Sequence, residues 1–341
     1  MKKYHLYLWI IALVGLMTSC SQDETDALQT ANESNRVTLT ASLPEDFAQI
    51  GTRALPSVSE HQLRCILEVW TKDASPVLKY REEKAGLTGE NLTFEFKIDD
   101  ATYDCLFWAD FIATNAETDA SASIGSVTYT HYADKYYATN TDNGLRAVSI
   151  TGTDYVERGK FTSDARDAFF SHAELKKEAG QNKTLSTSLT RPFAKLIIKE
   201  KNKEAFEKCA AMRINYTVPK TFNVLTGTAS GNYSVPSREF YPEGDGSNND
   251  LTLFSDLIFT SSDTRETLGQ ISLTFQPYAG VGNPDFQPVN IPAGIPLQRN
   301  YKTNATGSLL SAVTDKATVT VTMDAKWNGT EIDKNLDSKE Q

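Results

Sequence analysis

The sequence predicts an all-β protein with two β-sandwich domains and short helices only in the connections. Apolar residues alternate with polar ones in one segment after another, which is the period of a strand with one buried face. Strands do not alternate with long helical patterns, so a Rossmann or TIM-barrel architecture is not expected. The 341 residues, of which 40% are hydrophobic, supply enough apolar material for two cores.

The formal net charge of −10 excludes one class of partner. A protein that binds nucleic acid neutralises phosphates with a basic surface, and this composition offers none. We therefore expect no nucleic-acid partner.

Residues 1–19 have the features of a secretory signal peptide. Lys2 and Lys3 precede an apolar run over residues 6–17, which is too short to cross a bilayer comfortably. Small residues then lead to Cys20, an arrangement that resembles the lipobox of bacterial lipoproteins, where the signal is removed before the cysteine and its thiol is acylated. Two or more acyl chains, at about 0.8 kcal/mol per buried CH₂, hold a protein stably on a membrane. The alternative is an ordinary cleavage site beside a free cysteine.

Residues 20–35 form a polar stretch that we interpret as a lipid-anchored tether. The stretch is poor in aromatic residues and is not expected to pack. Its acidic beginning, Ser21 to Glu24, resembles the surface-export signal of Bacteroidetes lipoproteins. The expected location is the cell outer membrane, with the chain anchored through Cys20 and exposed at the surface.

The first predicted strand follows this tether. Its apolar face is formed by Val37, Leu39, Ala41 and Leu43, which alternate with hydroxyl residues. Further strands are predicted over residues 63–71, 92–98, 103–112, 194–198, 212–218, 251–259, 271–275 and 317–327. In the last of these strands, one face carries Ala317, Val319, Val321, Met323, Ala325 and Trp327.

The connections are predicted from weaker signals. Short helices are expected within residues 163–172, 202–212 and 308–313, and the polar segments 113–158 and 239–250 are expected to be loops. Thr190, Arg191 and Pro192 form the best candidate boundary. The expected domains are an N-terminal β-sandwich over 36–190 and a C-terminal β-sandwich over 191–330, followed by a polar tail over 331–341.

The sequence carries no recognised catalytic or cofactor-binding motif. The histidines do not have the spacing of zinc ligands, and nucleophile-elbow, phosphate-loop and dinucleotide motifs are absent. Asp245, Ser247, Asn249 and Asp256 have part of the spacing of a calcium loop, but Asp250 stands where such a loop needs glycine. A turn-rich loop is therefore favoured there. We expect no enzyme activity, no cofactor and no metal.

Three cysteines remain beyond Cys20. Cys65 and Cys105 lie on the apolar faces of predicted strands, and Cys209 lies in the short helix expected within residues 202–212. We expect them to be buried free thiols, with a Cys65–Cys105 cross-strand disulfide as the alternative in an exported protein.

The position of Arg53 suggests that a protease could release the first strand. It lies between Gly, Thr and Pro residues just after the first strand, where an Arg-specific or trypsin-like protease would have access. A cut after Arg53 would release the strand 37–43 and expose a hydrophobic groove with unpaired backbone groups. A complementary strand from another subunit satisfies such a groove most directly. The alternative is an ordinary surface arginine.

Several segments together resemble the Bacteroidetes fimbrillin-like lipoproteins of the major and minor fimbrillin (type V pilin) superfamily. The most specific is residues 295–304 (IPLQRNYKTN) with Gly307–Leu310 and the final strand. Supporting segments are Thr52–Ala54, Phe107–Asp110, Asp167–Phe170 and Arg191–Lys195.

The resemblance implies two transthyretin-like sandwiches, lipidation of Cys20, cleavage after Arg53 and strand exchange between subunits into fimbriae that act in adhesion. The implied partners are other fimbrial subunits, the protease, the outer-membrane lipid, and a glycan or protein receptor. The subunit's place as stalk, tip or anchor stays open.

The tail after Trp327 has no alternating apolar run, so the candidate donor strand is the final strand itself, with Val319, Val321 and Met323. The alternative function is a surface lipoprotein that binds glycans and does not polymerise. Its sugar platforms would be loop tyrosines: Tyr132, Tyr136, Tyr137, Tyr233 and Tyr241.

Overall fold

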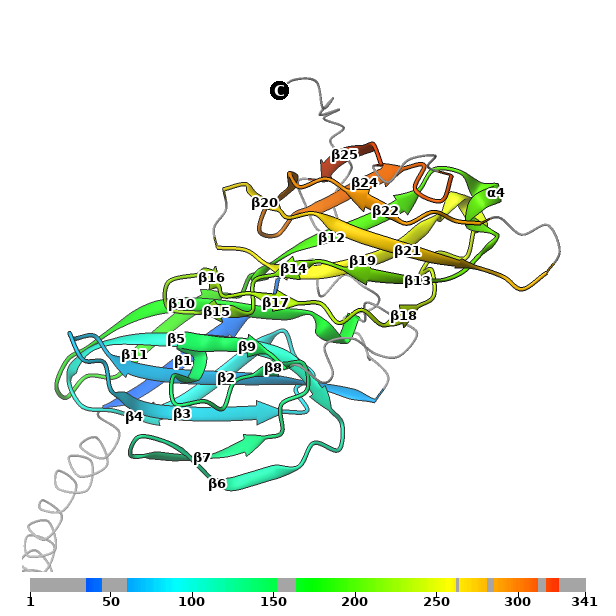
Figure 1. Ribbon diagram of the computed structural model, residues 1–341. Helices are drawn as coiled ribbons and strands as arrows, with labels where there is room; N and C mark the ends of the chain where they lie inside the picture. The colour runs from blue at the N-terminus through cyan, green and yellow to red at the C-terminus, as the bar shows by residue number, and fades with distance from the viewer. Residues whose placement is uncertain are drawn as a thin grey trace, which may run out of the picture.

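The computed structural model describes residues 35–44, 60–151, 164–261, 264–280, 285–311 and 317–324. Strands account for most of them, and the helices among these residues are short: α4 (Lys203–Phe206) and the 3₁₀ turns η1 (Gly144–Ala147), η2 (Asp164–Arg166) and η3 (Ser247–Asn249). The prediction of an all-β fold is confirmed. Figure 1 shows two sandwiches in contact, the first in blue to green and the second mainly in yellow to red.

The N-terminal sandwich consists of a three-stranded and a four-stranded sheet, in the orders β11-β1-β4 and β10-β5-β2-β3. Its strands are β1 (Arg36–Ser42), β2 (His61–Thr71), β3 (Leu78–Ala85), β4 (Asn91–Lys97), β5 (Ala101–Ala113), β10 (Ala168–Lys177) and β11 (Lys183–Ser188).

The C-terminal sandwich has two four-stranded sheets, in the orders β19-β12-β24-β25 and β18-β13-β21-β22. Its strands are β12 (Phe193–Glu200), β13 (Cys209–Asn215), β18 (Glu239–Phe240), β19 (Thr252–Phe259), β21 (Ile271–Pro277), β22 (Val289–Ile291), β24 (Lys302–Gly307) and β25 (Val319–Asp324). Shorter pairs are β14 (Thr217–Val218) with β17 (Tyr233–Ser234) and β20 (Glu266–Leu268) with β23 (Ile295–Leu297).

The two sandwiches repeat one strand order. In each, the first strand lies between a late strand that runs parallel to it and a middle strand that runs antiparallel: β1 between β11 and β4, and β12 between β24 and β19. The second strands lie in the other sheet of each sandwich, where β2 pairs with β3 and β5, and β13 pairs with β18 and β21. This is the transthyretin-like arrangement. The sandwiches differ at one edge, because β25 covers β24 while β11 has no such neighbour among the described residues.

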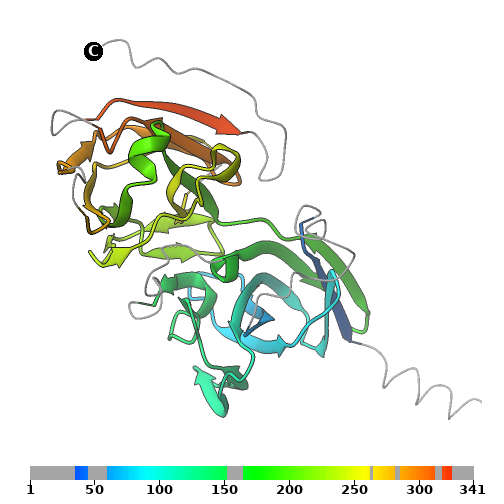
Figure 2. The same ribbon diagram turned by 90° about the vertical axis from the view of Figure 1, so that its right-hand side faces the viewer.

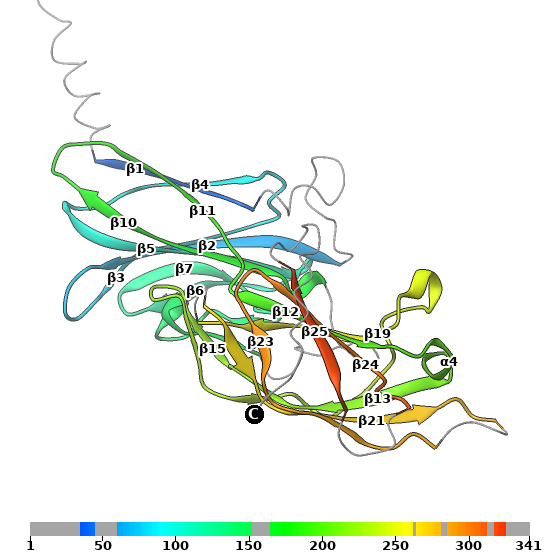
Figure 3. The ribbon, with the colours of Figure 1, turned by 90° about the horizontal axis from the view of Figure 1, so that it is seen from above.

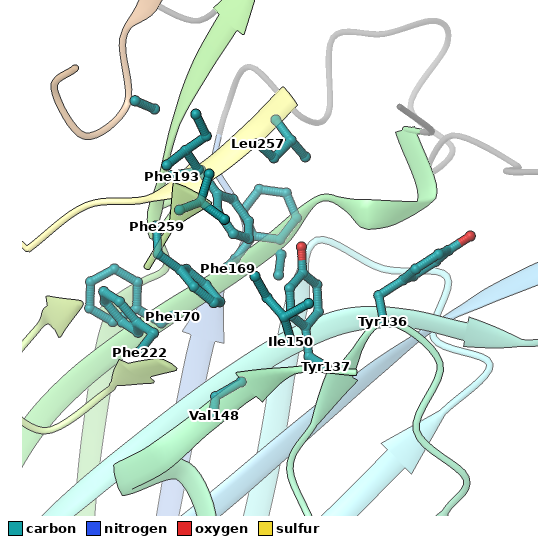
Figure 4. Packing of buried hydrophobic residues seen from close by; sticks show 14 of the residues in the cluster. Tyr136, Tyr137, Val148, Ile150, Phe169, Phe170, Phe193, Phe222, Leu257 and Phe259 are labelled. Carbon is teal, nitrogen blue, oxygen red and sulfur yellow. The ribbon is translucent and has the colours of Figure 1, made fainter. Parts of the chain in front are cut away.

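A composite sheet joins the two sandwiches. β8 (Tyr137–Ala138) and β9 (Val148–Ile150) come from the first sandwich, β15 (Thr221–Asn223) and β16 (Thr228–Ser230) come from the second, and the sheet order is β16-β15-β9-β8. Aromatic side chains fill the space beside it (Figure 4). The ring of Phe170 from the first sandwich lies 4.6 Å from the ring of Phe222 in the second, and the ring of Tyr137 lies 5.8 Å from that of Phe193. The apolar core is therefore continuous through both sandwiches, and the division at residues 190 and 191 stays a prediction.

Two predictions about connections were wrong. The segment 113–158, predicted as a loop, contains β6 (Thr118–Ile124), β7 (Val127–Tyr132), β8 and β9. These strands are short, and β6 is mostly exposed, so they show little apolar alternation. Within the segment 163–172, predicted as helical, residues 164–172 form η2 and the start of β10. Phe169 and Phe170 are both buried there because both faces of that strand are covered.

The remaining helix predictions were also too long. Within residues 202–212 only α4 is helical, and β13 begins at Cys209. Residues 308–311 contain no helix, and residues 312 and 313 lie outside the described ranges.

Candidate strand-exchange site

β1 occupies the middle of its sheet although it is the first strand of the chain. It pairs in parallel with β11, from Val37 opposite Lys183 to Ser42 opposite Ser188. It pairs antiparallel with β4, from Arg36 opposite Lys97 to Ser42 opposite Asn91. Figure 3 shows β1 between these two strands. Both edges of β1 are therefore engaged in backbone hydrogen bonds.

The alternation predicted for this strand is confirmed. Val37, Leu39 and Ala41 are completely buried and Leu43 is nearly so. The outward hydroxyls bond to β4, with Thr40 Oγ1 lying 3.2 Å from Thr93 Oγ1. Burial of each large aliphatic side chain contributes about 1.5–3 kcal/mol relative to exposure. β1 is thus a core strand held by both its side chains and its backbone.

β11 depends on β1 for its place in the sheet. Among the described residues its only ladder is the one to β1, whereas the equivalent β24 pairs with both β12 and β25. β11 buries little side-chain surface, since Leu185 and Thr187 are only half-buried and its other residues are exposed. Thr187 also contacts Ser171 of β10, with 2.6 Å between the hydroxyl oxygens.

The two ends of β1 make further bonds to the segment around β11. Asn35, whose backbone is left-handed at φ 81°, accepts hydrogen bonds through Oδ1 from Lys177 Nζ and from the Gly180 amide, each at 3.0 Å. The Arg36 amide donates to Asn182 Oδ1 at 2.9 Å. At the other end, the Leu189 amide donates to the Ser42 carbonyl at 2.8 Å.

The candidate donor strand is an edge strand. β25 pairs antiparallel with β24, its single ladder within the described part of the chain. Met323 is buried, but Val319 and Val321 are half-buried. Figure 2 shows β25 at the outer edge of the C-terminal sandwich. The sequence pattern predicts one fully packed face, and the exposure differs because no strand among the described residues follows on the far side of β25. Ala325 and Trp327 lie outside the described residues.

Other predicted site residues fall outside the described ranges. These are Cys20, Arg53, the signal peptide, the tether up to residue 34 and the tail 331–341.

The tyrosines proposed as sugar platforms do not form one surface. Tyr136 and Tyr137 are buried, and Tyr137 packs against Trp108 and Phe193 in the aromatic core. Tyr132 and Tyr233 are half-buried, and Tyr241 is 60% exposed. Tyr136 and Tyr137 therefore offer no sugar platform, because Tyr136 stacks against His61 and Tyr137 packs in the aromatic core between the sandwiches.

The cysteines and the acidic loop behave as the favoured interpretations predict. Cys65, Cys105 and Cys209 are buried and free. Cys65 lies opposite Ala109 while Cys105 lies opposite Val69, so the two cannot bridge directly. Burial raises the pKa of Cys105 to about 12, which keeps its thiol protonated and unreactive. Asp256 accepts from Arg166 and Tyr216 in the core rather than joining Asp245.

A buried charge network in the N-terminal sandwich was missed by sequence reasoning. Arg64 donates to both carboxylate oxygens of Asp110, at 2.9 and 2.8 Å, and to Asp134 at 2.9 Å. Arg81 bonds to Glu68 and, at 2.6 Å, to Glu83. Such residues alternate with apolar ones in β2 and β3, as they would on a solvated face, but here the β6–β7 hairpin covers that face.

The same network fixes the charge of Glu83. Burial opposes ionisation, but the hydrogen bond from His131 and the guanidinium groups of Arg64 and Arg81 outweigh it, and the pKa of Glu83 falls to about 2. Glu83 therefore remains a carboxylate at neutral pH. Among the described residues no group of three or more His, Cys, Asp or Glu side chains is arranged to hold a metal ion. No helix in these ranges is long and apolar enough to span a membrane.

Two transthyretin-like sandwiches in one chain, with the first strand at the centre of its sheet, define the class of fold. Within that class the chain belongs to DUF6562, a family of unknown function, whose model matches residues 29–339. No curated protein matches the sequence.

Several solved structures are similar in fold. A DUF1812 protein of Bacteroides thetaiotaomicron, named a putative polysaccharide binding protein, shares 10% identity over 84% of this chain and 95% of that chain, with a TM-score of 0.46. A putative cell adhesion protein of Bacteroides eggerthii shares 13% identity over 85% and 96%, with a TM-score of 0.41. The tip fimbrial protein Mfa3 of Porphyromonas gingivalis shares 9% identity over 84% and 98%, with a TM-score of 0.42.

Proposed function

We propose that this protein is a surface-exposed lipoprotein that serves as a fimbrial subunit in adhesion and is assembled by protease-triggered donor-strand exchange. Cys20 carries the lipid that holds it on the outer membrane, and cleavage after Arg53 releases the first strand. The observation that carries the proposal is the place of β1, a first strand that is nevertheless central and fully packed.

Removal of β1 would leave its neighbouring strands without backbone and side-chain partners. The inward edges of β4 and β11 would each lose a row of hydrogen-bond partners, and Leu92, Phe94 and Phe96 would lose the aliphatic neighbours that lie opposite them on β1. Unpaired backbone groups in an apolar groove are costly, so the groove favours an added strand. A strand from another subunit therefore joins two molecules firmly.

β25 is the donor that the fold supports best. It is an edge strand, so its departure breaks one ladder rather than two. Val319, Val321 and Met323 alternate with threonines, as the inward residues of β1 do. The partners in this proposal are other fimbrial subunits, an Arg-specific or trypsin-like protease, and a glycan or protein receptor. We assign the protein no catalytic role.

The first test is the N-terminus and intact mass of the protein recovered from the cell surface of its native host. Chains that begin at Ala54 and migrate as heat-resistant ladders support the proposal. Arg53→Ala should then leave monomers, whereas Arg36→Ala, a matched change on the same segment, should leave the ladders unchanged. Monomers that still begin at an acylated Cys20 would overturn it in favour of a subunit that does not exchange strands.

A further inference from the structure

The residue just before β1 is recognised by its side chain. Asn35 Oδ1 accepts from Lys177 Nζ and from the Gly180 amide, so the turn between β10 and β11 closes on the beginning of the strand (Figure 3). Most other contacts of β1 at its ends use backbone atoms, which any strand could supply. The contact at Asn35 requires an oxygen acceptor on a side chain.

The electrostatics at this position favour an anion. Lys177 is only 4% exposed. Its hydrogen bonds go to Asn35 and to the Glu178 carbonyl, and it forms no ion pair with a carboxylate among the described residues. A buried ammonium bonded only to neutral oxygens gains from a carboxylate, because charge-assisted hydrogen bonds are stronger than neutral ones. A replacement strand with Asp at this position would therefore bind better than one with Ala.

The C-terminal region contains a segment of this kind. Residues 315–323 (DKATVTVTM) repeat residues 35–43 (NRVTLTASL) class by class. Asp315 corresponds to Asn35 and Lys316 to Arg36, and aliphatic and hydroxyl residues then alternate identically. Asp315 and Lys316 lie outside the described residues.

Only one register suits both ends of the site. A shift by two residues in one direction places Ala317 beside Lys177 and puts the long side chain of Met323 in the fully buried position of Ala41, where the matching register places the smaller Val321. A shift in the other direction places Asp315 in the fully buried position of Val37. The matching register avoids both conflicts.

We propose that Lys177 and Gly180 set the register of strand exchange by binding Asp315 of a second copy of this chain. In this register Lys316 faces Glu95, as Arg36 does at 3.9 Å, and Thr320 takes the place of Thr40 opposite Thr93. The inference rests on the proposed function and names both the partner segment and the residues that select it.

The test uses the full chain with a site-specific protease sequence in place of residues 51–54, cut so that β1 remains bound without a covalent link. Synthetic peptides of residues 313–325 then compete with β1, and native mass spectrometry measures the exchange. The wild-type peptide should displace β1, and Asp315→Ala should weaken binding about tenfold or more, the range for a hydrogen bond to a charged group. Asp315→Asn should fall between them. Lys316→Ala should stay within about twofold, because its partner is exposed.

Two further measurements test the role of Lys177 and the register of the bound peptide. In Lys177→Ala protein, or Lys177→Gln if that variant does not fold, the difference in binding between the wild-type peptide and the Asp315→Ala peptide should vanish. A Thr93→Cys protein should form a mixed disulfide with a Thr320→Cys peptide and not with Thr318→Cys or Thr322→Cys peptides.

The outcomes separate the two proposals. Equal binding of the wild-type and Asp315→Ala peptides, or cross-linking in another register, would refute the role of Lys177 and leave strand exchange standing. A nicked chain that binds none of the peptides would refute both.

Discussion

Arg166 donates from Nη2 to Oδ1 of Asp256 at 2.7 Å, and both side chains are essentially fully buried. Arg166 precedes β10 in the N-terminal sandwich, and Asp256 lies on β19 in the C-terminal sandwich. This pair therefore links the two sandwiches through their shared core. A buried charge that loses its partner is strongly unfavourable, so the link contributes to the stability of the whole chain.

Asp256→Ala should reduce the free energy of unfolding by about 3–5 kcal/mol, because it removes a buried carboxylate that accepts hydrogen bonds from Arg166 and Tyr216. Urea unfolding followed by circular dichroism measures the change. Glu204→Ala, which breaks an exposed pair with Lys208, should change it by less than about 0.5 kcal/mol. Equal effects of the two substitutions would contradict this prediction.

Leu39→Ala should cost about 2–5 kcal/mol, because Leu39 is fully buried at the centre of β1. Thr38→Ala, one residue away on the outward face, should cost less than about 1 kcal/mol. Chemical denaturation of the two variants compares them directly. A small effect of Leu39→Ala would mean that β1 contributes little to the core.

Release of β1 should also release β11. In a chain cut between β1 and β2 and freed of the β1 segment, amides of Lys183–Ser188 should exchange with deuterium much faster, because their ladder partner is gone. β24, which keeps β12 and β25, should show unchanged protection. Continued protection of β11 would show that it pairs anew with β4.

Gly144→Ala should destabilise the fold by about 2 kcal/mol or more. The glycine has φ +49°, and an added Cβ would overlap Oε1 of the buried Glu68. Gly125→Ala is a matched control, since that glycine also has positive φ but has nothing within 4 Å of an added Cβ. The difference in melting temperature between the variants isolates the contact with Glu68 from backbone strain.

Acid should weaken the network around Glu83. The pKa of this group is lowered from 4.5 to about 2 in the folded state, so its stabilising contribution is present above pH 4.5 and is lost as the pH falls toward 2. The contribution is on the order of 3 kcal/mol. Unfolding free energies measured from neutral pH down to the folded-state pKa should fall less steeply in Glu83→Gln than in the wild type.

The sequence predicted strands best where one face of the strand is exposed to solvent. β1 and β4 were predicted well because Val37, Leu39, Phe94 and Phe96 alternate with hydroxyl or charged residues. The helix predicted at the start of β10 was wrong because this part of the strand is buried on both sides, which removes the alternation at Phe169 and Phe170.

The site was predictable only in part for the same reason. Periodicity identifies a strand but not its neighbours, so the central position of β1 and the dependence of β11 on it required the structure. The buried charges were hidden as well, because Arg64 and Glu68 stand at alternate positions of β2 that resemble a solvated face. The contact between Asn35 and Lys177 joins residues 142 apart in the chain, and no local pattern could indicate it.

The composite sheet has a mechanical consequence. β9 and β15 come from different sandwiches and are bonded to each other, and the chain passes from Leu189 to Phe193 through three intervening residues. A tension applied to one sandwich and resisted by the other must shear this ladder and separate the ring contacts of Tyr137 with Phe193 and of Phe170 with Phe222, instead of straightening a slack connection. The molecule would bear load as a single stiff rod whose length hardly changes until the core between its halves gives way.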